Sequence, residues 1–282
     1  MGEHAIEERR VASGFVDLAT LQRPTRHVFL SPHYDDIALS SGGTAALAAK
    51  GTGEADVALI FGDHPDPDQP LTGFAQSLHR QWGMDAGSVI AGRRAEEAKA
   101  SEILGTRDLF LPFRDAIYRG ERYTSDPVLF SQPADDEADL PRKVAEAAGL
   151  SGPADASVRI YAPLAIGFHV DHQHAFIAGL RLAREGWEVW FYEDLPYALR
   201  NGAKDRRLAA IGTMVKPGPL VDVEPVWTEK IDAIMAYPSQ LSTIFGDYVG
   251  VGSTREAIDS AMSRYARELA VGGGPAHGRQ AL

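Results

Sequence analysis

Short apolar stretches alternate with helix-like stretches along most of this chain, and this alternation limits the folds that it can adopt. The apolar stretches are HVFLS, DVALIFG, DLFLPF, VRIYAPL and EVWFYE. The helix-like stretches between them are SGGTAALAAKG, RRAEEAKASEILG, LPRKVAEAAGL and HQHAFIAGLRLAREG. Strands that alternate with helices are typical of a mostly parallel sheet with helices on both faces. We therefore predict an α/β, Rossmann-like fold that forms a single domain over residues 1–282.

The two ends of the chain depart from this alternation. Residues 1 to about 24 mix charges with short apolar patches, and we expect them to form an arm on the domain edge. The stretch GTMVKPGPLVDVEP predicts a C-terminal hairpin that turns at Pro217 and Gly218. WTEKIDAIMAYPSQ predicts a helix broken at Pro238, and STREAIDSAMSRYARELA predicts a last helix. Residues from about 271 to 282 are expected to be a flexible tail.

Composition excludes several classes of protein. The net charge is −11 and the pI about 5.3, which argues against nucleic acid or an anionic membrane as a partner. The chain has no cysteine, so disulfides, thiolate metal ligands and cysteine nucleophiles are excluded. The N-terminus is too charged for a signal peptide, and no stretch approaches the ~20 apolar residues of a membrane span. We expect a cytoplasmic protein.

Side chains with reactive groups follow each of the five apolar stretches. In open parallel sheets, ligands bind beyond the carboxyl ends of the strands, so these side chains should gather at one edge. They are His33, Asp35, Asp36, Asp63, His64, Arg114, Asp115, Tyr118, His169, Asp171, His172, His174, Glu193, Asp194 and Tyr197. The pattern predicts an active site at this edge.

Two long connections also lie near this edge. The stretch from Gly62 to about Gly92 is rich in glycine and proline and longer than ordinary connections, which is typical of lids and binding loops. Its Phe74 and Trp82 could line a pocket, although packing within the insert is the favoured interpretation. A second insert, from Asp115 to about Asp139, contains the acidic run ADDEAD, and such a run more often forms a solvated face.

Two clusters among these side chains point to a bound metal. In PHYDD, His33 is followed by the adjacent carboxylates Asp35 and Asp36. Taken alone, both aspartates could form the turn or cap the next helix. The second cluster crowds six positions of a chain with nine histidines, and its members are His169, Asp171, His172 and His174. It could be a surface loop, but two such clusters at strand ends of one sheet favour a metal site.

PHYDD and HVDH resemble the two signature motifs of the LmbE/PIG-L family of zinc-dependent de-N-acetylases, which are usually written PHPDDE and HxDH. The resemblance extends from roughly His27 to Gln240. Tyr34 replaces the second proline of the family pattern, and Ile37 replaces its glutamate. Neither position is a metal ligand in that pattern, so the departures bear on the substrate and on the geometry of the turn.

The resemblance implies a metal site with a hydrolytic role. Its ligands would be His33, Asp36 and His172, which leave a fourth position for water. The implied metal is Zn2+, with Fe2+ or Co2+ as alternatives. Two histidines and one carboxylate leave the metal acidic enough to activate that water and to polarise an amide carbonyl. Asp35 would be the general base.

The resemblance also implies roles for the second motif. His169 would stabilise the oxyanion that forms when water attacks an acetamide. Asp171 would hold the His169 ring in one tautomer and favour the imidazolium. Either Asp35 or His169 would protonate the leaving amine. His174 has no counterpart role, and we expect it to pack or to be exposed.

The substrate side of the site is harder to predict. Arg93 begins an Arg-x-x-Glu pattern that resembles the family's substrate-side arginine helix, and its guanidinium could bind a hydroxyl or a carboxylate. The alternative is a surface arginine paired with Glu96 or Glu97. Weaker candidates for substrate binding are Asp115, Glu193 and Gln240.

The resemblance therefore predicts hydrolysis of an N-acyl group, in the first place N-acetyl, on an amino sugar or a sugar-containing metabolite. The expected partner is a small N-acetylated molecule, with no nucleic acid and no membrane, and a homo-oligomer stays open. A metal-dependent phosphoesterase is an alternative, but that chemistry usually needs two metals. A metal-free nucleotide-binding protein would need a glycine fingerprint, which is absent. A metal-binding homologue without turnover is the remaining alternative.

Overall fold

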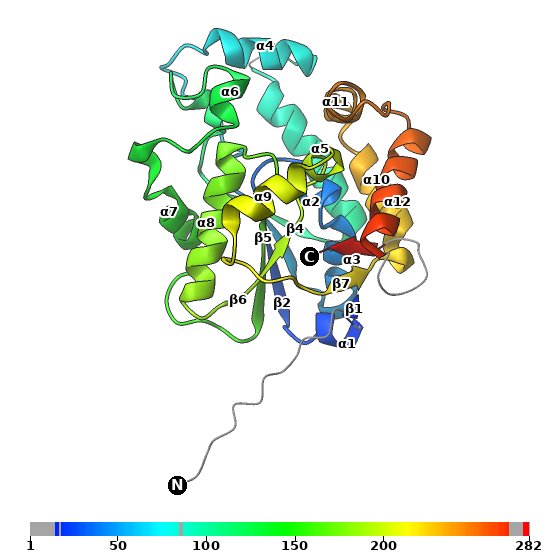
Figure 1. Ribbon diagram of the computed structural model, residues 1–282. Coiled ribbons are helices and arrows are strands. Elements are labelled where there is room, and N and C mark those ends of the chain that lie inside the picture. The colour runs from blue at the N-terminus through cyan, green and yellow to red at the C-terminus, as the bar shows by residue number, and fades with distance from the viewer. Residues whose placement is uncertain (1–14, 17, 85–86, 271–278, 282) are drawn as a thin grey trace.

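A five-stranded parallel sheet forms the centre of the molecule (Figure 1). The computed structural model describes residues 15–16, 18–84, 87–270 and 279–281. The strands are β2 (Arg26–Ser31), β3 (Ala55–Leu59), β4 (Arg107–Phe110), β5 (Val158–Pro163) and β6 (Glu188–Tyr192), in the order β4-β3-β2-β5-β6. They coincide with the five apolar stretches, so the predicted parallel α/β fold is confirmed.

The direction in which the chain adds strands to the sheet changes between β2 and β5. From β2 the chain proceeds outward to β3 and β4, and it then returns to β5, on the other side of β2, before it reaches β6. In doubly wound sheets, ligands bind at the carboxyl edge beside this switch in direction. The residues after β2 and after β5 are the two motif-bearing loops of the sequence.

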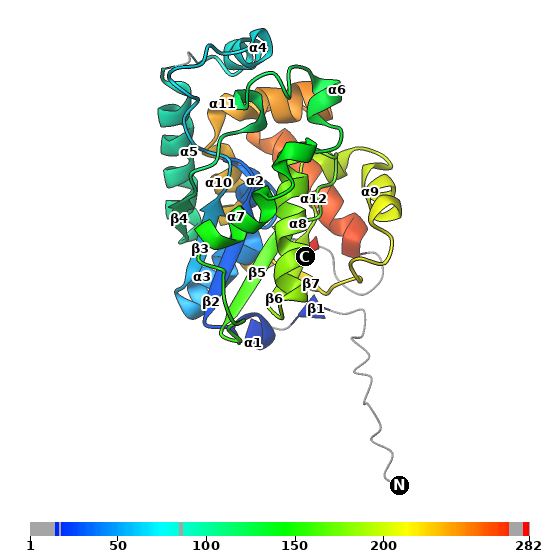
Figure 2. The same ribbon diagram turned by 90° about the vertical axis from the view of Figure 1, so that its left-hand side faces the viewer.

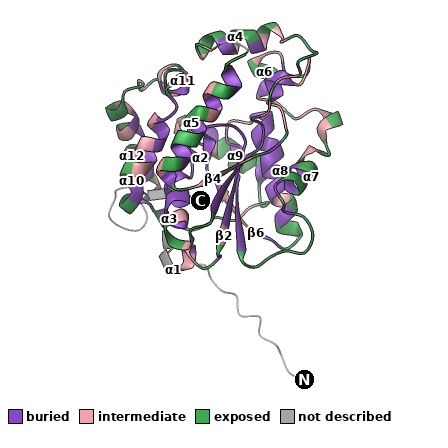
Figure 3. Ribbon diagram, turned by 180° about the vertical axis from the view of Figure 1, so that it is seen from behind, coloured by how far each residue is buried: buried purple, intermediate pink, exposed green. Residues whose placement is uncertain are grey.

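Both faces of the sheet are covered, because alternate residues of each strand point to opposite sides. Val28 and Leu30 of β2 pack in the core of one face, whereas Phe29 packs in the core of the other. The first face is covered by α7 (Leu140–Ala147) and α8 (Val170–Arg184), and the second by α3 (Gly42–Thr52), α5 (Val89–Leu104), α10 (Trp227–Met235) and α12 (Arg255–Ala270). Figure 3 shows the strands buried between these two layers, with the exposed residues on the outer sides of the helices.

The predicted C-terminal hairpin is wrong. β7 (Leu220–Asp222) pairs in parallel with β1 (Phe15–Val16) and antiparallel with β8 (Arg279–Ala281), in a separate small sheet. Pro217 and Pro219 have no N–H group to donate, so the residues just before β7 are poor partners for a ladder. Within the predicted tail, residues 279–281 form this strand, and residues 271–278 and 282 lie outside the described part of the chain.

The predicted helix break at Pro238 is confirmed. α10 ends at Met235, and α11 (Pro238–Leu241) begins at the proline and continues into a π-helical segment, η5 (Ser242–Val249). The predicted last helix is α12, and the remaining short helices of the core region are α1 (Leu18–Leu21), α2 (Asp36–Leu39), η3 (Tyr197–Leu199), α9 (Ala203–Ile211) and η4 (Glu224–Val226). None of the described helices is both long enough and apolar enough to cross a membrane.

The two inserts pack together at the same end of the molecule (Figure 2). Their short helices are α4 (Gly73–Gln81), η1 (Ala116–Tyr118), α6 (Asp126–Leu129) and η2 (Asp135–Glu137). Phe74 and Trp82 pack on an apolar cluster that also holds Ile117 of η1 and Val170 of α8, so packing of the insert is the observed use of both aromatic side chains. The inserts therefore lie against the start of the helix that carries the second motif.

Candidate active site

The two motif-bearing loops show strained backbone. Among the described residues, three other than glycine have positive φ, namely Asp35 at 85°, Ala165 at 61° and Phe168 at 66°. The first lies in the loop after β2 and the other two in the loop after β5. Positive φ is unfavourable for most side chains, and such strain concentrates at functional sites. The backbone thus singles out the same two loops as the sequence motifs.

The three predicted metal ligands converge. Asp36 Oδ2 lies 3.5 Å from His33 Nδ1 and 3.3 Å from His172 Nε2. The backbone N–H of His33 donates to the same oxygen at 2.8 Å. Burial alone would raise the pKa of Asp36, but His172 and His33 outweigh it and hold that pKa below its ordinary value. The two loops therefore place two imidazoles around one carboxylate.

His172 supplies the clearest test of whether a metal fits. Its side chain is 1% exposed, and Nδ1 is hydrogen-bonded to Asp194 Oδ1 at 2.7 Å. Within the described part of the chain, Nε2 has no hydrogen-bond partner. A buried nitrogen without a partner is costly, and two imidazoles with one carboxylate are a donor set of catalytic zinc sites. The residues present therefore fit a divalent metal.

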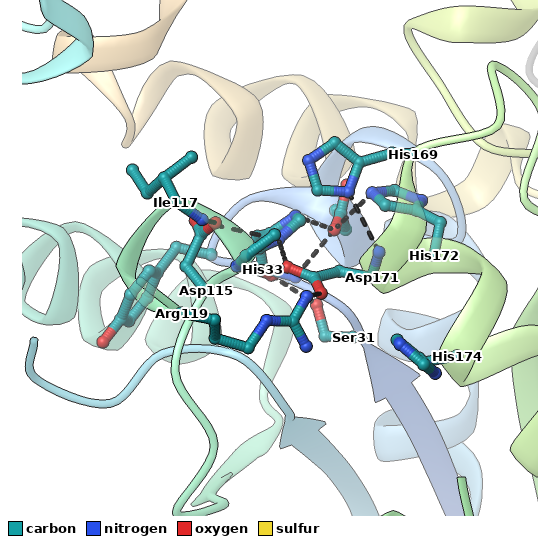
Figure 4. A network of polar contacts seen from close by, with 12 residues as sticks. Ser31, His33, Asp115, Ile117, Arg119, His169, Asp171, His172 and His174 are labelled. Atoms are coloured by element: carbon teal, nitrogen blue, oxygen red, sulfur yellow. Dashed lines mark hydrogen bonds and ion pairs between the residues drawn. The ribbon is translucent and has the colours of Figure 1, made fainter. Parts of the chain in front are cut away.

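A second grouping contains His169 in place of Asp36. Ligand atoms of His33, His169 and His172 all lie within 4.8 Å of one another (Figure 4). Asp36 is the better third ligand because its oxygen contacts both of the other histidines, whereas His169 Nδ1 already accepts the backbone N–H of Asp171 at 3.2 Å. These contacts favour Asp36 over His169 as the third side chain of a metal site.

The other nitrogen of His33 faces carboxylates. His33 Nε2 lies 3.0 Å from Asp171 Oδ2 and 3.8 Å from Asp115 Oδ2. Burial alone would lower the pKa of His33, but Asp115, Asp171 and Asp36 together raise it well above its ordinary value. With a carboxylate hydrogen-bonded at Nε2, the nitrogen that His33 presents to Asp36 is Nδ1.

Asp171 was predicted to hold the His169 ring in one tautomer, and in the structure its carboxylate does not do so. Asp171 holds that ring through its backbone N–H, which donates to His169 Nδ1. Its fully buried carboxylate instead accepts from His33, from Arg119 and from the backbone N–H of Ala116. The imidazolium is not favoured either, because burial and the neighbouring His33 lower the pKa of His169 well below its ordinary value. With Nδ1 as an acceptor, the hydrogen of the neutral ring is on Nε2.

Asp35 contacts Arg93. Arg93 Nη2 lies 3.6 Å from Asp35 Oδ1 and donates to the carbonyl oxygen of Tyr34 at 3.1 Å. Burial raises the pKa of Asp35 to about 7, the adjacent Asp36 adds to the rise, and Arg93 opposes it. A carboxyl group with a pKa near neutrality is suited to proton transfer.

Arg93 is itself buried, so the alternative of a surface arginine paired with Glu96 or Glu97 is wrong. Glu97 accepts the backbone N–H of Asp35 at 3.3 Å, and Glu96 accepts the backbone N–H of Ser239 at 2.9 Å. Both glutamates thus have partners other than the arginine. Arg93 instead contacts Tyr34 and Asp35 of the loop after β2.

The other predicted substrate residues are divided. Asp115 belongs to the site, because its carboxylate lies beside His33. Glu193 forms an ion pair with Lys204, and Gln240 is buried and donates to the neighbouring serine. No described contact joins either of these side chains to the histidines. Their role in substrate binding stays a prediction.

Three side chains that support the site had no role predicted from the sequence. Arg119 binds the Asp171 carboxylate, and its Nε lies 3.3 Å from Glu137 Oε1. Glu137 belongs to ADDEAD, so the expected solvated face is wrong at this residue, whose side chain is 9% exposed and whose Oε2 lies 3.1 Å from His174 Nε2. His174 packs, as expected. Asp194, the partner of His172, was placed at the right edge by the strand-end pattern, but nothing local indicated its partner.

A row of aromatic rings begins at the histidines. The Phe130 ring centre lies 5.3 Å from that of His169, and the Tyr197 ring centre lies 5.3 Å from that of His172. Tyr248 follows at 5.5 Å from Tyr197. All three aromatic side chains are half-buried, and we call them the aromatic row. Such rings can pack against the apolar face of a ring-shaped ligand.

Known proteins resemble this chain in sequence and in fold. No family model matches the chain. It is 33% identical over 225 residues to a 2'-N-acetylparomamine deacetylase of Streptomyces fradiae, a match that covers 77% of this chain and 74% of the relative. It is 28% identical over 241 residues to a 2'-N-acetylparomamine deacetylase of Niallia circulans, with 78% and 82% covered.

The solved structures that resemble this fold include deacetylases. A deacetylase of teicoplanin biosynthesis matches with a TM-score of 0.69 and 26% identity over 90% of this chain and 96% of the other. A deacetylase of the A40926 pseudoaglycone matches with a TM-score of 0.62 and 27% identity over 91% and 96%. A zinc-inhibited form of the teicoplanin deacetylase matches with a TM-score of 0.68 and 25% identity over 90% and 96%.

Proposed function

This chain belongs to the LmbE/PIG-L family of de-N-acetylases, and from that premise we propose that it is a zinc-dependent hydrolase of N-acetylated amino sugars. The observation that carries the proposal is the meeting of the two motifs. Asp36 Oδ2 lies 3.5 Å from His33 Nδ1 and 3.3 Å from His172 Nε2. Among the described residues, His172 Nε2 has no hydrogen-bond partner.

In this proposal the metal is held by His33, Asp36 and His172. A bound Zn2+ would supply the acidity that activates a water and polarises the acetamide carbonyl. The protein supports each histidine with a carboxylate on the nitrogen that faces away from Asp36, as is usual for metal-binding histidines. Asp171 serves His33, and Asp194 serves His172.

Asp35 is proposed to move the protons. It takes one from the attacking water and delivers it to the amine nitrogen as the C–N bond breaks, so that acetate and a free amine are the products. Arg93 Nη2 lies 3.6 Å from the Asp35 carboxylate and gives it a cationic partner of its own, separate from the histidines around Asp36. Adjacent carboxylates can then serve separate functions, one in metal binding and one in acid–base chemistry.

His169 is proposed to donate to the oxyanion as a neutral ring. Its Nδ1 accepts the Asp171 backbone N–H, which leaves Nε2–H as the donor. A fixed donor that needs no reorientation stabilises developing negative charge most effectively. This replaces the imidazolium that the resemblance implied with a neutral hydrogen-bond donor.

For the substrate we propose an N-acetylglucosamine-type ring joined to a second ring, as in the N-acetylparomamine that names two relatives. The aromatic row supports this choice, because it extends from the histidines and could contact both rings of such a substrate. Phe130 contacts His169, Tyr197 contacts His172, and Tyr248 contacts Tyr197. A net charge of −11 also suits a partner with several amino groups, since opposite charge speeds encounter.

The test is release of acetate from three compounds by the zinc-loaded protein, with and without a chelator. The compounds are 2'-N-acetylparomamine, free N-acetylglucosamine and an N-acetylated glycopeptide. We expect the highest kcat/KM with the first and loss of activity in the chelator. Equal turnover in the chelator would contradict the metal, and activity confined to the glycopeptide would contradict the substrate class.

A further inference from the structure

Arg119 lies at the point where the second insert meets the proposed metal site. It follows η1, between the carboxyl end of β4 and the acidic run ADDEAD. Its side chain is 11% exposed, and its guanidinium binds the carboxylate of Asp171, which is fully buried. Asp171 in turn accepts from His33 Nε2 at 3.0 Å (Figure 4). A continuous polar connection thus leads from the insert to a proposed ligand.

The arginine is fixed on its other sides as well. Its Nε lies 3.3 Å from Glu137 Oε1, and its guanidinium carbon lies 5.2 Å from the Phe61 ring centre and 5.1 Å from that of Tyr123. The Tyr123 hydroxyl donates to Glu137 at 2.7 Å. A planar guanidinium between two rings, with a carboxylate at each end, has one orientation. An ordinary surface ion pair has no such enclosure.

We propose that Arg119 is a positioning residue for His33, which acts through Asp171 to set which nitrogen faces the metal. The buried Asp171 carboxylate needs a cation, and Arg119 supplies it on Oδ1 while Oδ2 is left for His33. With Nε2–H bound to Asp171, His33 presents Nδ1 toward Asp36 at 3.5 Å. The insert is therefore part of the metal site. This inference rests on the proposed metal ligands but not on the proposed substrate.

Glu137 belongs to the same device. Its Oε1 lies 3.3 Å from Arg119 Nε as an ion pair, and its Oε2 lies 3.1 Å from His174 Nε2 on α8, so it connects the far end of the insert to the helix that carries Asp171. The acidic run ADDEAD thus contributes one inward-facing carboxylate. A lysine at position 119 could pair with Asp171 but could not present a planar fork to both carboxylates.

The test compares Arg119→Met with Arg122→Met. Arg122 lies in the same insert and pairs with Asp136, but both of these side chains are exposed, at 44% and 59%. Metal-free proteins are titrated with Zn2+ and with Co2+ against a chromophoric chelator, and their circular dichroism is compared with that of the wild type. We expect about 10–100-fold weaker metal binding for Arg119→Met, as for other outer partners of metal ligands. Arg122→Met should bind within about twofold of the wild type.

The double variant Arg119→Met/Asp171→Asn separates positioning from folding. It removes the buried Arg119–Asp171 pair as a whole, and Glu137 keeps His174 and Tyr123 as partners, so the double variant should fold even if Arg119→Met alone does not. If the arginine acts through Asp171, the double variant binds metal as weakly as Asp171→Asn and no more weakly. Arg119→Lys should recover part of the affinity.

Two results would overturn the inference: metal binding by Arg119→Met within twofold of the wild type, or losses in the double variant that simply add. Wild-type protein that binds no metal would instead remove the proposed function itself. The visible absorption spectrum of bound Co2+ is an independent measure of the metal site. It should change in Arg119→Met and not in Arg122→Met.

Discussion

The two histidines of the proposed metal site are supported in different ways. His172 is held by Asp194, which follows β6 and also accepts the backbone N–H of Ile166 at 3.0 Å. This side of the site is built by neighbouring strands of the sheet. His33 is held by Asp171, whose charge is balanced by Arg119 from an insert. The His172 side of the site is thus supported by residues that follow strands of the sheet, whereas the His33 side depends on Arg119 of the second insert.

The largest expected effect is on the side built by the sheet. His172→Ala removes a proposed ligand. The metal affinity should therefore fall by more than about 100-fold, which is the upper limit for loss of an outer partner. His174→Ala is the matched control, because it removes an equally buried histidine two positions along α8. Elemental analysis after gel filtration measures both. Equal metal content in the two variants would show that burial, not ligation, distinguishes these histidines.

The second prediction separates the two carboxylates of the loop after β2. Asp35→Asn should keep the metal and lower kcat by about 10²–10⁴-fold, since general acid–base catalysis contributes about that much. Asparagine is chosen because it tolerates the left-handed backbone at this position, where φ is 85°. Steady-state kinetics and metal content are measured on the same sample. Activity near that of the wild type would assign the proton transfers to another residue.

The third prediction compares the supports directly. Asp194→Asn and Asp171→Asn should each weaken metal binding by about 10–100-fold. Asp171→Asn should also lower the free energy of unfolding by about 3 kcal/mol, because it leaves the Arg119 charge buried without its partner. For Asp194→Asn we expect a loss of about 1 kcal/mol, measured by urea denaturation. Equal losses of stability would contradict the distinction between the two halves.

The smallest effect concerns the end of α2, the helix that begins at Asp36. Lys230 of α10 is 2% exposed, and its Nζ donates to the carbonyl oxygens of Ala38, Leu39 and Ser40 at 2.8–3.2 Å. Lys230→Met should lower the free energy of unfolding by about 2 kcal/mol, because these buried acceptors lose their shared donor.

The matched control for Lys230→Met is Lys50→Met, which removes a lysine that also contacts α10. Lys50 pairs with Glu229, next to Lys230 in the chain, but its side chain is 55% exposed. The loss should stay below about 1 kcal/mol, as for other exposed pairs. Urea denaturation of the metal-free proteins measures both variants. A larger loss for Lys50 than for Lys230 would show that the end of α2 is not stabilised from α10.

The sequence predicted what depends on local pattern. Five apolar stretches became five parallel strands, and both motifs lie at the carboxyl edge between β2 and β5. Strand, turn and helix signals are all short-range, so the two clusters could be placed at one edge of the sheet before the structure was known. The ligand set of His33, Asp36 and His172 came from the resemblance to the family motifs.

What could not be predicted is the choice of partner across long separations. Asp171 was paired with His169, its neighbour in sequence, but its carboxylate binds Arg119, which lies 52 positions away. Glu137 lies in a run whose composition suits solvent, yet it faces inward because Arg119 and Tyr123 meet it there. The error at β7 has the same origin, because its partners come from the two ends of the chain.

The left-handed backbone at Asp35 has a consequence for anyone who wishes to redesign this enzyme. Only glycine, asparagine and aspartate adopt that conformation readily, so a longer acid or a hydroxyl residue at position 35 would rotate the peptide that leads into Asp36. The proposed base and the proposed ligand next to it therefore share the same stretch of main chain. Very few substitutions could change the proposed acid–base group alone and leave the conformation of Asp36 unaltered.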